Sequence, residues 1–240
     1  MARFYCPLPL VTGQVLDLPP TAARHVQVLR MQPGHTLTLF NGEGGEFSAE
    51  VQHMGRSDVR VVVGEHRNVE CEARCQVHLA VGMPANERMD WLVEKATELG
   101  VAHISPVMSQ HTVLRLSGER GLKRQQHWQG IAQAACAQSG RNRVPQIDAP
   151  VALSEWLKTW PQATDGCTKV VLSLQEGARA WREVWGDQPP PKLVLLSGPE
   201  GGLSSEEEAL ARSLGFAAVQ LGSRVLRSET APLAVLAQLL

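Results

Sequence analysis

Three short apolar runs in the last third of the chain constrain its fold more than any other feature of the sequence. They span residues 169–174, 193–197 and 217–221, and each is bounded by residues that interrupt regular structure. Runs of this kind are expected of strands that are buried on both faces of a parallel sheet. Because helical patterns lie between such runs, the sequence predicts an α/β domain with a mostly parallel sheet flanked by helices.

The same alternation of strands and helices begins near residue 73, so this domain is expected to span residues 73–240. Residues 76–81 and 104–107 have the pattern of strands, and residues 123–138 have that of a helix. Another helix follows Asn86, its predicted cap. Its apolar positions are Met89, Leu92, Val93, Ala96 and Leu99, and Gly100 ends it. The tryptophans expected to pack in the core are Trp91, Trp128, Trp156 and Trp181.

Residues 1–70 have a different pattern, which is rich in short strands. Its predicted elements are strands at 36–40, 46–51 and 58–63 and a helix at 20–31. The glycine-rich segment between the first two strands predicts a hairpin with a loop longer than two residues. Several short strands with one helix predict a small β-barrel, and the charged residues 65–72 are the expected linker to the second domain.

The composition excludes several classes of protein. With 43% hydrophobic and 20% charged residues among 240, the chain is not expected to be disordered. No apolar run approaches the roughly 20 residues that a membrane span needs, and the N-terminus lacks the apolar core of a signal peptide. The protein is therefore expected in the cytoplasm, without a membrane partner.

The five cysteines predict neither disulfides nor a metal site. Their number is odd, and no second pair of cysteines or histidines lies at zinc-binding spacing. Free, buried thiols are expected at Cys6, Cys71, Cys75, Cys136 and Cys167.

The net charge of −1 conceals a basic segment between His111 and Arg143. Glu119 is the single acid within it. Its cations are Arg115, Arg120, Lys123, Arg124, Arg141 and Arg143. Such a segment can attract an anionic partner without making the whole protein bind nucleic acid indiscriminately.

A glycine-rich loop follows the apolar run at residues 193–197. It reads Gly-Pro-Glu-Gly-Gly over residues 198–202 and leads into a helix that Ser204 and Glu207 can open as a capping box. Glycines let backbone groups approach a ligand closely, and α/β folds bind ligands at the carboxyl ends of their strands. The loop lacks the Lys-Ser/Thr of a P-loop and the spacing of a dinucleotide-binding motif. It is therefore either a tight turn without a ligand or a site for another kind of ligand.

Two further strand ends favour a ligand site. Residues 221–232 leave a strand through glycine and contain two arginines. They then enter a helix with Thr230 as its predicted cap and proline in its first turn. Residues 174–177 leave a third strand, again through glycine. Three such loops predict one pocket for a compact, mostly neutral nucleoside held by backbone hydrogen bonds.

Several separated motifs resemble those of one family. The two strand-end loops, residues 198–204 and 221–231, are similar to the paired motif of the bacterial 16S ribosomal RNA uridine-N3 methyltransferases. The resemblance extends to residues 87–101 and 135–145, and to an N-terminal motif at residues 24–34. It therefore covers nearly the whole chain.

This resemblance implies a SPOUT-type α/β domain with a C-terminal trefoil knot, preceded by a PUA-like barrel for RNA. It also implies a homodimer that uses S-adenosylmethionine to methylate N3 of a uridine in the decoding region, on 16S ribosomal RNA or the assembled small ribosomal subunit. The implied cofactor residues are Leu172, Leu174, Leu196, Gly198, Pro199, Glu200, Gly201, Leu221, Gly222, Val225, Leu226 and Arg227.

Two side chains are candidates for the chemistry of such a reaction. The uridine N3 must lose its proton and meet the sulfonium methyl in line, so orientation and stabilisation of the uridine anion are the main tasks. Arg227 is the first candidate for stabilising that anion or binding the adjacent phosphate; the alternative is an ion pair with Glu229 or Glu200. Glu200 is the candidate for assisting deprotonation. Alternatively, it accepts hydrogen bonds from loop amides or lies near the sulfonium.

The RNA surface is predicted from the barrel and the basic segment. The arginines expected to contact phosphates are Arg3, Arg24, Arg30, Arg115, Arg120, Arg124, Arg141 and Arg143. Two alternatives to the predicted function stay open. One is an enzyme of the same fold that acts on another RNA position or atom, and the other is a non-catalytic dimer that only binds RNA.

Overall fold

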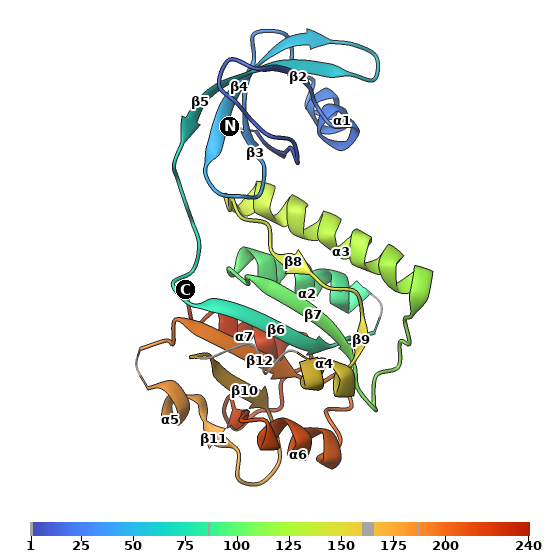
Figure 1. Ribbon diagram of the computed structural model, residues 1–240, viewed down its shortest axis with the longest axis vertical. Helices are drawn as coiled ribbons and strands as arrows, with labels where there is room; N and C mark the ends of the chain where they lie inside the picture. The colour runs from blue at the N-terminus through green and yellow to red at the C-terminus, as the bar shows by residue number, and fades with distance from the viewer. Residues whose placement is uncertain (1, 86, 160–165, 187) are drawn as a thin grey trace. The chain divides into compact units, whose positions relative to one another are not determined.

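The computed structural model describes residues 2–85, 87–159, 166–186 and 188–240. The chain forms two compact units (Figure 1). One comprises residues 1–72 with 133–144, and the other comprises residues 73–132 with 145–240. The ranges predicted from the sequence, 1–70 and 73–240, assign residues 133–144 to the C-terminal domain, whereas here they pack with the N-terminal unit. The predicted cap Asn86 lies outside the described residues.

The N-terminal unit is built on a five-stranded sheet with the order β1-β3-β4-β5-β2. Its elements are β1 (Arg3–Tyr5), β2 (Val15–Asp17), α1 (Pro20–Val28), β3 (Thr36–Phe40), β4 (Glu46–Met54) and β5 (Val59–Arg67). The predicted hairpin is confirmed, because β3 and β4 pair antiparallel. The buried side chains of this unit include Leu37, Leu39, Val51, Val61 and Val63.

Two predicted boundaries in this unit are wrong by a few residues. The helix predicted over residues 20–31 ends at Val28, since Arg30 turns the chain with a φ of 53°. The linker predicted from residue 65 begins later, because β5 continues to Arg67, which pairs with Glu46 of β4.

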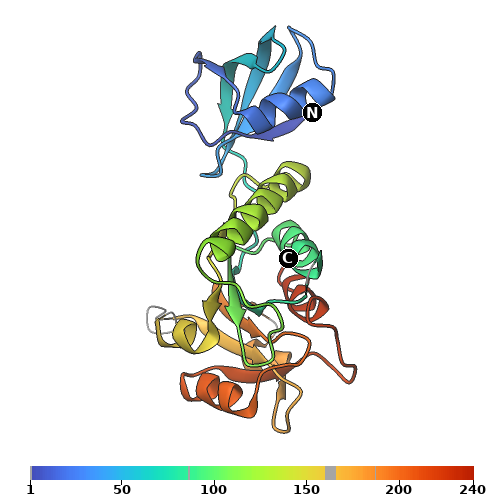
Figure 2. The same ribbon diagram turned by 90° about the vertical axis from the view of Figure 1, so that its right-hand side faces the viewer.

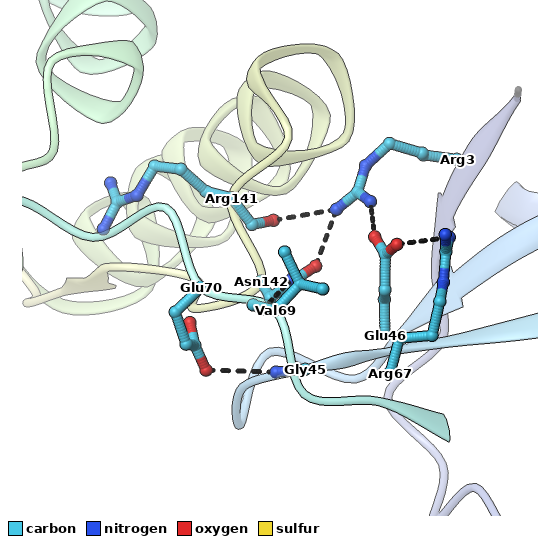
Figure 3. Close-up of polar contacts among 8 residues, drawn as sticks. All are labelled: Arg3, Gly45, Glu46, Arg67, Val69, Glu70, Arg141 and Asn142. Atoms are coloured by element: carbon cyan, nitrogen blue, oxygen red, sulfur yellow. Dashed lines mark hydrogen bonds and ion pairs between the residues drawn. The ribbon is translucent and has the colours of Figure 1, made fainter. Parts of the chain in front are cut away.

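Residues 133–144 are held in the N-terminal unit by the polar contacts drawn in Figure 3. Arg3 forms an ion pair with Glu46 and donates hydrogen bonds to the backbone carbonyl of Arg141 at 3.3 Å and to Oδ1 of Asn142 at 2.7 Å. Asn142 in turn donates to the carbonyl of Val69 at 2.6 Å. This segment, which comprises the end of α3 and the loop after it, is therefore part of the N-terminal fold, although it lies far from it in sequence.

The C-terminal unit is built on an eight-stranded sheet in which the strand pairings are parallel. Its main path has the order β11-β13-β10-β12-β6-β7-β8, and β9 pairs with β7. The strands are β6 (Gln76–Gly82), β7 (His103–Met108), β8 (Gln146–Ile147), β9 (Val151–Ala152), β10 (Thr168–Leu172), β11 (Arg179–Ala180), β12 (Lys192–Ser197) and β13 (Ala217–Gln220). The predicted α/β class with a mostly parallel sheet is confirmed.

Helices cover both faces of this sheet (Figure 2). They are α2 (Glu87–Glu98), α3 (Gly118–Ser139), α4 (Leu153–Thr159), α5 (Trp181–Trp185), α6 (Ser205–Ser213) and α7 (Thr230–Leu236). Helices α2 and α7 pack together on one face, and α4 and α6 pack together on the other. Among the described residues, no helix is long and apolar enough to cross a membrane.

Some predictions for this unit need correction. Trp128 and Trp156 are buried as expected, but Trp91 is 45% exposed because it lies off the buried stripe of α2. Trp181 is only half-buried, on the short helix α5. Thr230 does not cap α7; it is the first residue of the helix, after Glu229.

The five cysteines are free, as predicted. Cys6, Cys75 and Cys136 are buried, whereas Cys71 is exposed and Cys167 is half-buried. Burial raises the pKa of Cys75 and of Cys136 to about 11, so these two thiols stay protonated at neutral pH.

A polar network lies near the amino ends of β6 and β7. Ser105 Oγ donates to Asp148 Oδ2 at 2.5 Å and lies 2.7 Å from His78 Nε2, while His103 Nε2 lies 2.7 Å from the same carboxylate oxygen. Burial lowers the pKa of His78 to about 2, so its ring is neutral. Short hydrogen bonds therefore connect these polar groups at the end of the sheet where the strands begin.

Candidate cofactor-binding site

A cavity of about 540 Å³ lies where β10, β12 and β13 end. Its volume is within the range of roughly 300–1,000 Å³ that is usual for small-molecule sites. The loops after these three strands line it, together with Arg88 of α2 and Glu208 of α6. Because all of these elements belong to the C-terminal unit, the cavity is a feature of that unit alone.

The three strand-end loops predicted from the sequence meet at this cavity. The predicted cofactor residues that line it are Leu172, Leu174, Gly198, Pro199, Glu200, Gly201, Leu221, Gly222, Val225, Leu226 and Arg227. Leu196 is the exception. It is fully buried in the hydrophobic core of the sheet, and the next residue, Ser197, lines the cavity instead.

Close backbone approach explains why the loop after β12 is rich in glycine. A Cβ atom on Gly198 would lie 2.8 Å from the carbonyl carbon of Gly202 and 2.9 Å from the amide nitrogen of Leu203, which is closer than real Cβ contacts. A Cβ on Gly201 would lie 2.8 Å from the Cβ of His111. Side chains at these positions would therefore force the loop open.

The helix after this loop begins with the predicted capping box. Ser204 Oγ accepts a hydrogen bond from the Glu207 amide, and the Glu207 carboxylate accepts one from the Ser204 amide. The second carboxylate oxygen of Glu207 accepts from the Gln110 amide at 2.7 Å, in the loop after β7. One side chain thus fixes the start of α6 and attaches a second loop to it.

Arg88 connects the two glycine-bearing loops, and it is not among the residues predicted from the sequence. Its Nη1 lies 3.3 Å from Oε1 of Glu200, and its Nε lies 3.9 Å from Oε1 of Glu229. Glu200 Oε1 also accepts a hydrogen bond from the Ala85 amide at 3.0 Å. Arg88 lies within one of the motifs that carry the family resemblance, but sequence could not reveal carboxylate partners that lie so far along the chain.

Arg227 therefore does not form the ion pair that was the alternative to a functional role. Its side chain is exposed, and no ion pair links it to another of the described residues. Its backbone is fixed, because its carbonyl accepts hydrogen bonds from the amides of Thr230 and Ala231 at 2.9 and 3.0 Å. A guanidinium on a fixed turn beside the cavity is available to an anionic group.

Glu208 is a second residue at the cavity that sequence reasoning missed. It is 3% exposed, accepts hydrogen bonds from Ser173 Oγ at 2.8 and 2.9 Å, and pairs with Arg212. Ser173 directly follows β10, so these contacts fix the loop that leads to Leu174. No sequence pattern indicates this role, since Glu208 is one of three adjacent acids at the start of a helix.

The arginines predicted to contact RNA fall into three groups. Those that are exposed and free of an ion pair to other described residues are Arg24, Arg30, Arg115, Arg120 and Arg124. Arg143 is exposed but lies 3.3 Å from Glu70. Arg3 is engaged with Glu46 and Asn142, and Arg141 is 3% exposed with its Nε 3.1 Å from Glu72. These last two side chains hold the fold, so the structure argues against their predicted phosphate contacts.

Comparison with known proteins identifies the family. Residues 71–240 match the family described as RNA methyltransferase domain, and residues 18–64 match the RNA methyltransferase PUA domain. The ribosomal RNA small subunit methyltransferase E of Bacillus subtilis is 29% identical over 214 residues, which cover 87% of this chain and 82% of that protein. The chain belongs to the ribosomal RNA small subunit methyltransferase E family.

Solved structures of similar proteins agree with this assignment. The family member from Neisseria gonorrhoeae, bound to S-adenosylmethionine, is 36% identical with a TM-score of 0.91 and covers 99% of this chain and 96% of that one. A Legionella pneumophila protein named as a methyltransferase, in complex with the same cofactor, is also 36% identical, with a TM-score of 0.92 over 99% and 96% of the two chains. The predicted family and the PUA-like N-terminal domain are thereby confirmed, and the cofactor expected from the sequence is the one bound in both relatives.

Proposed function

We propose that this protein transfers a methyl group from S-adenosylmethionine to N3 of a uridine in the 16S ribosomal RNA of the small ribosomal subunit. Membership of the ribosomal RNA small subunit methyltransferase E family supports the class of reaction and the kind of RNA. The observation that carries the proposal is the cavity of about 540 Å³ at three strand ends, with the exposed Arg227 at its edge and no ion pair from Arg227 to another described residue. The choice of uridine and of its N3 atom rests on the resemblance of the paired loop motif.

The residues at the cavity fit S-adenosylmethionine. Leu174 and Val225 line the cavity although they are 73% and 75% exposed, and such exposed apolar groups are suited to contact an adenine ring. Because Gly198 has no Cβ, the two sides of the loop can pack against each other, and the backbone of the loop can face the ligand. Glu200 lines the same cavity and supplies negative charge for the sulfonium or the amino group. The predicted cofactor residues that line the cavity, with the exception of Arg227, are therefore proposed to bind it.

When bound, this cofactor supplies an electrophilic methyl group on a positively charged sulfur. The N3–H bond of uridine gives its proton to solvent or a base, a bond forms between N3 and the methyl carbon, and the carbon–sulfur bond breaks with its electron pair left on sulfur. The task of the chain is to orient the reactants and to stabilise negative charge on the uracil ring. We assign the second task to Arg227, whose guanidinium is exposed beside the cavity.

Glu200 is proposed to hold the loop rather than to act as the base. Its Oε1 accepts from the Ala85 amide and lies 3.3 Å from Arg88, so the charge of the carboxylate is stabilised by these contacts. Both contacts join the loop after β12 to the chain at the start of α2. This favours the structural alternative over the predicted role in deprotonation.

The remaining expectations concern partners and topology. We propose that the exposed arginines Arg24, Arg30, Arg115, Arg120 and Arg124 contact RNA phosphates, that the protein acts as a homodimer in the cytoplasm, and that the C-terminal strands and loops form the SPOUT trefoil knot. Light scattering of the purified protein tests the dimer, and a monomer at micromolar concentration would contradict it.

A methylation assay tests the proposed function. Small subunits and free 16S RNA, both purified from cells that lack a family enzyme, are incubated with the protein and labelled S-adenosylmethionine, and the product is mapped by mass spectrometry. A methyl group on N3 of one uridine is expected. Methylation of a ribose oxygen or of another base would overturn the N3 assignment, and calorimetry without detectable cofactor binding would favour the non-catalytic RNA-binding dimer.

A further inference from the structure

Three chain segments that are distant in sequence meet at Arg88. Arg88 lies in the first turn of α2, Glu200 lies in the loop after β12, and Glu229 directly precedes α7. The guanidinium presents two different nitrogens to the two carboxylates, Nη1 to Glu200 at 3.3 Å and Nε to Glu229 at 3.9 Å. All three residues belong to the C-terminal unit, and Arg88 itself lines the cavity.

Glu229 has the greater need for this cation. It is 7% exposed, and besides the ion pair with Arg88 it accepts a hydrogen bond from the neutral Ser228 hydroxyl, which donates to Oε2 at 3.2 Å. A buried carboxylate is costly unless a positive charge or several donors stabilise it. Among the described residues, Arg88 is the cation that forms an ion pair with Glu229 and with Glu200.

Arg227 is the competing cation, because it lies two residues before Glu229 and on the edge of the same cavity. If Arg88 were removed, both carboxylates would lose their cation and would attract the Arg227 guanidinium. An Arg227 bound to Glu229 would present a neutralised pair, rather than a net positive charge, to the uracil anion. The state of Arg227 therefore depends on Arg88.

We propose that Arg88 is a positioning residue for methyl transfer. It forms ion pairs with Glu200 and Glu229, so that neither carboxylate binds Arg227 and the Arg227 guanidinium can face the RNA. This inference rests on the proposed function, since it assumes that Arg227 stabilises the developing negative charge. Arginine suits the task because its planar fork can reach two carboxylates at once, whereas a lysine ammonium is a single point charge.

A rescue experiment tests the proposal. In Arg88→Ala, methyl transfer to RNA under single-turnover conditions is expected to slow by about 10²-fold, as when a transition-state donor is lost. Adding Glu229→Gln removes the carboxylate that captures Arg227. The double variant R88A/E229Q is therefore expected to transfer the methyl group at least about tenfold faster than R88A. Arg88→Lys is expected to be intermediate, because a lysine ammonium keeps the charge but lacks the planar fork that presents Nη1 to Glu200 and Nε to Glu229.

The rescue distinguishes positioning from a purely structural role. If Arg88 only held the two loops together, removal of a second member of the network would make the loss larger, and a double variant no faster than R88A would overturn the proposal. The matched control is Lys95→Ala on the same helix, which removes a cation 2.6 Å from Glu94 and 2.7 Å from Glu98, both half-buried. Its transfer rate is expected to stay within about twofold of the wild-type rate.

A second measurement does not depend on activity, so it separates failure of this inference from failure of the proposed function. A crystal structure of R88A is expected to show the Arg227 guanidinium within about 4 Å of Glu229 or Glu200. If Arg227 stays unpaired there, the inference is wrong even if the enzyme methylates uridine N3. If Arg227 is captured but the wild-type protein methylates another atom, the inference holds and the proposed substrate position fails.

Discussion

The cofactor cavity of the C-terminal unit and the ion network of the N-terminal unit use arginine differently. We define the N-terminal ion network as Arg3, Glu46, Arg67, Glu72 and Arg141. There, the Arg141 guanidinium is 3% exposed and bonded to Glu72. At the cavity, Arg88 forms ion pairs with Glu200 and Glu229. The Arg227 guanidinium is exposed there, without an ion pair to other described residues. The position of the carboxylates thus decides which arginine is available to a ligand.

Arg227→Ala is expected to have the largest effect and would test this comparison at the cavity. Loss of a cation that stabilises charge in the transition state costs about 10²-fold to 10³-fold in rate. The single-turnover rate of RNA methylation measures this effect, and calorimetry with S-adenosylmethionine should show cofactor affinity within about threefold of wild type. A variant that loses cofactor affinity but keeps its rate at saturation would show that Arg227 binds the cofactor instead.

Arg141→Ala is the corresponding change in the N-terminal ion network. It leaves the Glu72 carboxylate without its cation in a partly buried site, so unfolding in urea is expected to become easier by about 3 kcal/mol. Arg143→Ala is the matched control, because its side chain is 55% exposed and 3.3 Å from Glu70, and it should cost less than about 1 kcal/mol. If Arg141→Ala kept its stability and instead weakened RNA binding, Arg141 would be a phosphate contact after all.

These two arginines also show where sequence reasoning succeeds and fails. The glycine-bearing loops could be predicted, because an apolar strand followed by glycine and a capping box is a local pattern of a few residues. The role of Arg141 could not, because its partner Glu72 lies 69 residues away and a count of charges in one segment does not include it. The same limit hid Arg88, which lies 112 residues from Glu200. Local turns are encoded locally, whereas ion pairs depend on the tertiary fold.

The strand and helix predictions failed mainly at their ends. The strand predicted to reach residue 174 stops at Leu172, because Ser173 bonds to Glu208 and the chain turns toward the cavity. The exposure of Trp91 has a similar cause, since helical spacing alone does not say how wide the buried stripe of α2 is. Both errors concern residues whose environment is set by other elements of the C-terminal unit.

Gly198→Ala tests the part of the cavity that depends on backbone rather than charge. The new Cβ would lie 2.8 Å from a backbone carbon of Gly202, so the loop must open and the affinity for S-adenosylmethionine is expected to fall about tenfold, or about 1.4 kcal/mol. Calorimetry measures this change. Gly130→Ala in α3 is the matched control, since its Cβ would meet nothing within 4 Å and should leave cofactor affinity unchanged. Equal affinities for the two variants would mean that the loop has room to adapt.

Arg124→Ala is expected to have the smallest effect and extends the comparison to the exposed arginines. Arg124 has no ion pair to another described residue, whereas the neighbouring Lys123 lies 2.8 Å from Glu119. A free cation that contacts a phosphate should weaken RNA binding about threefold and lower the slope of log K against log salt concentration by about 1. Lys123→Ala should change this slope less, because its charge is already partly neutralised by Glu119.

RNA binding measured at several salt concentrations distinguishes the two variants. Equal slopes for both variants would show that this face of α3 does not contact RNA, and that exposure without an ion pair is not sufficient to identify a phosphate contact.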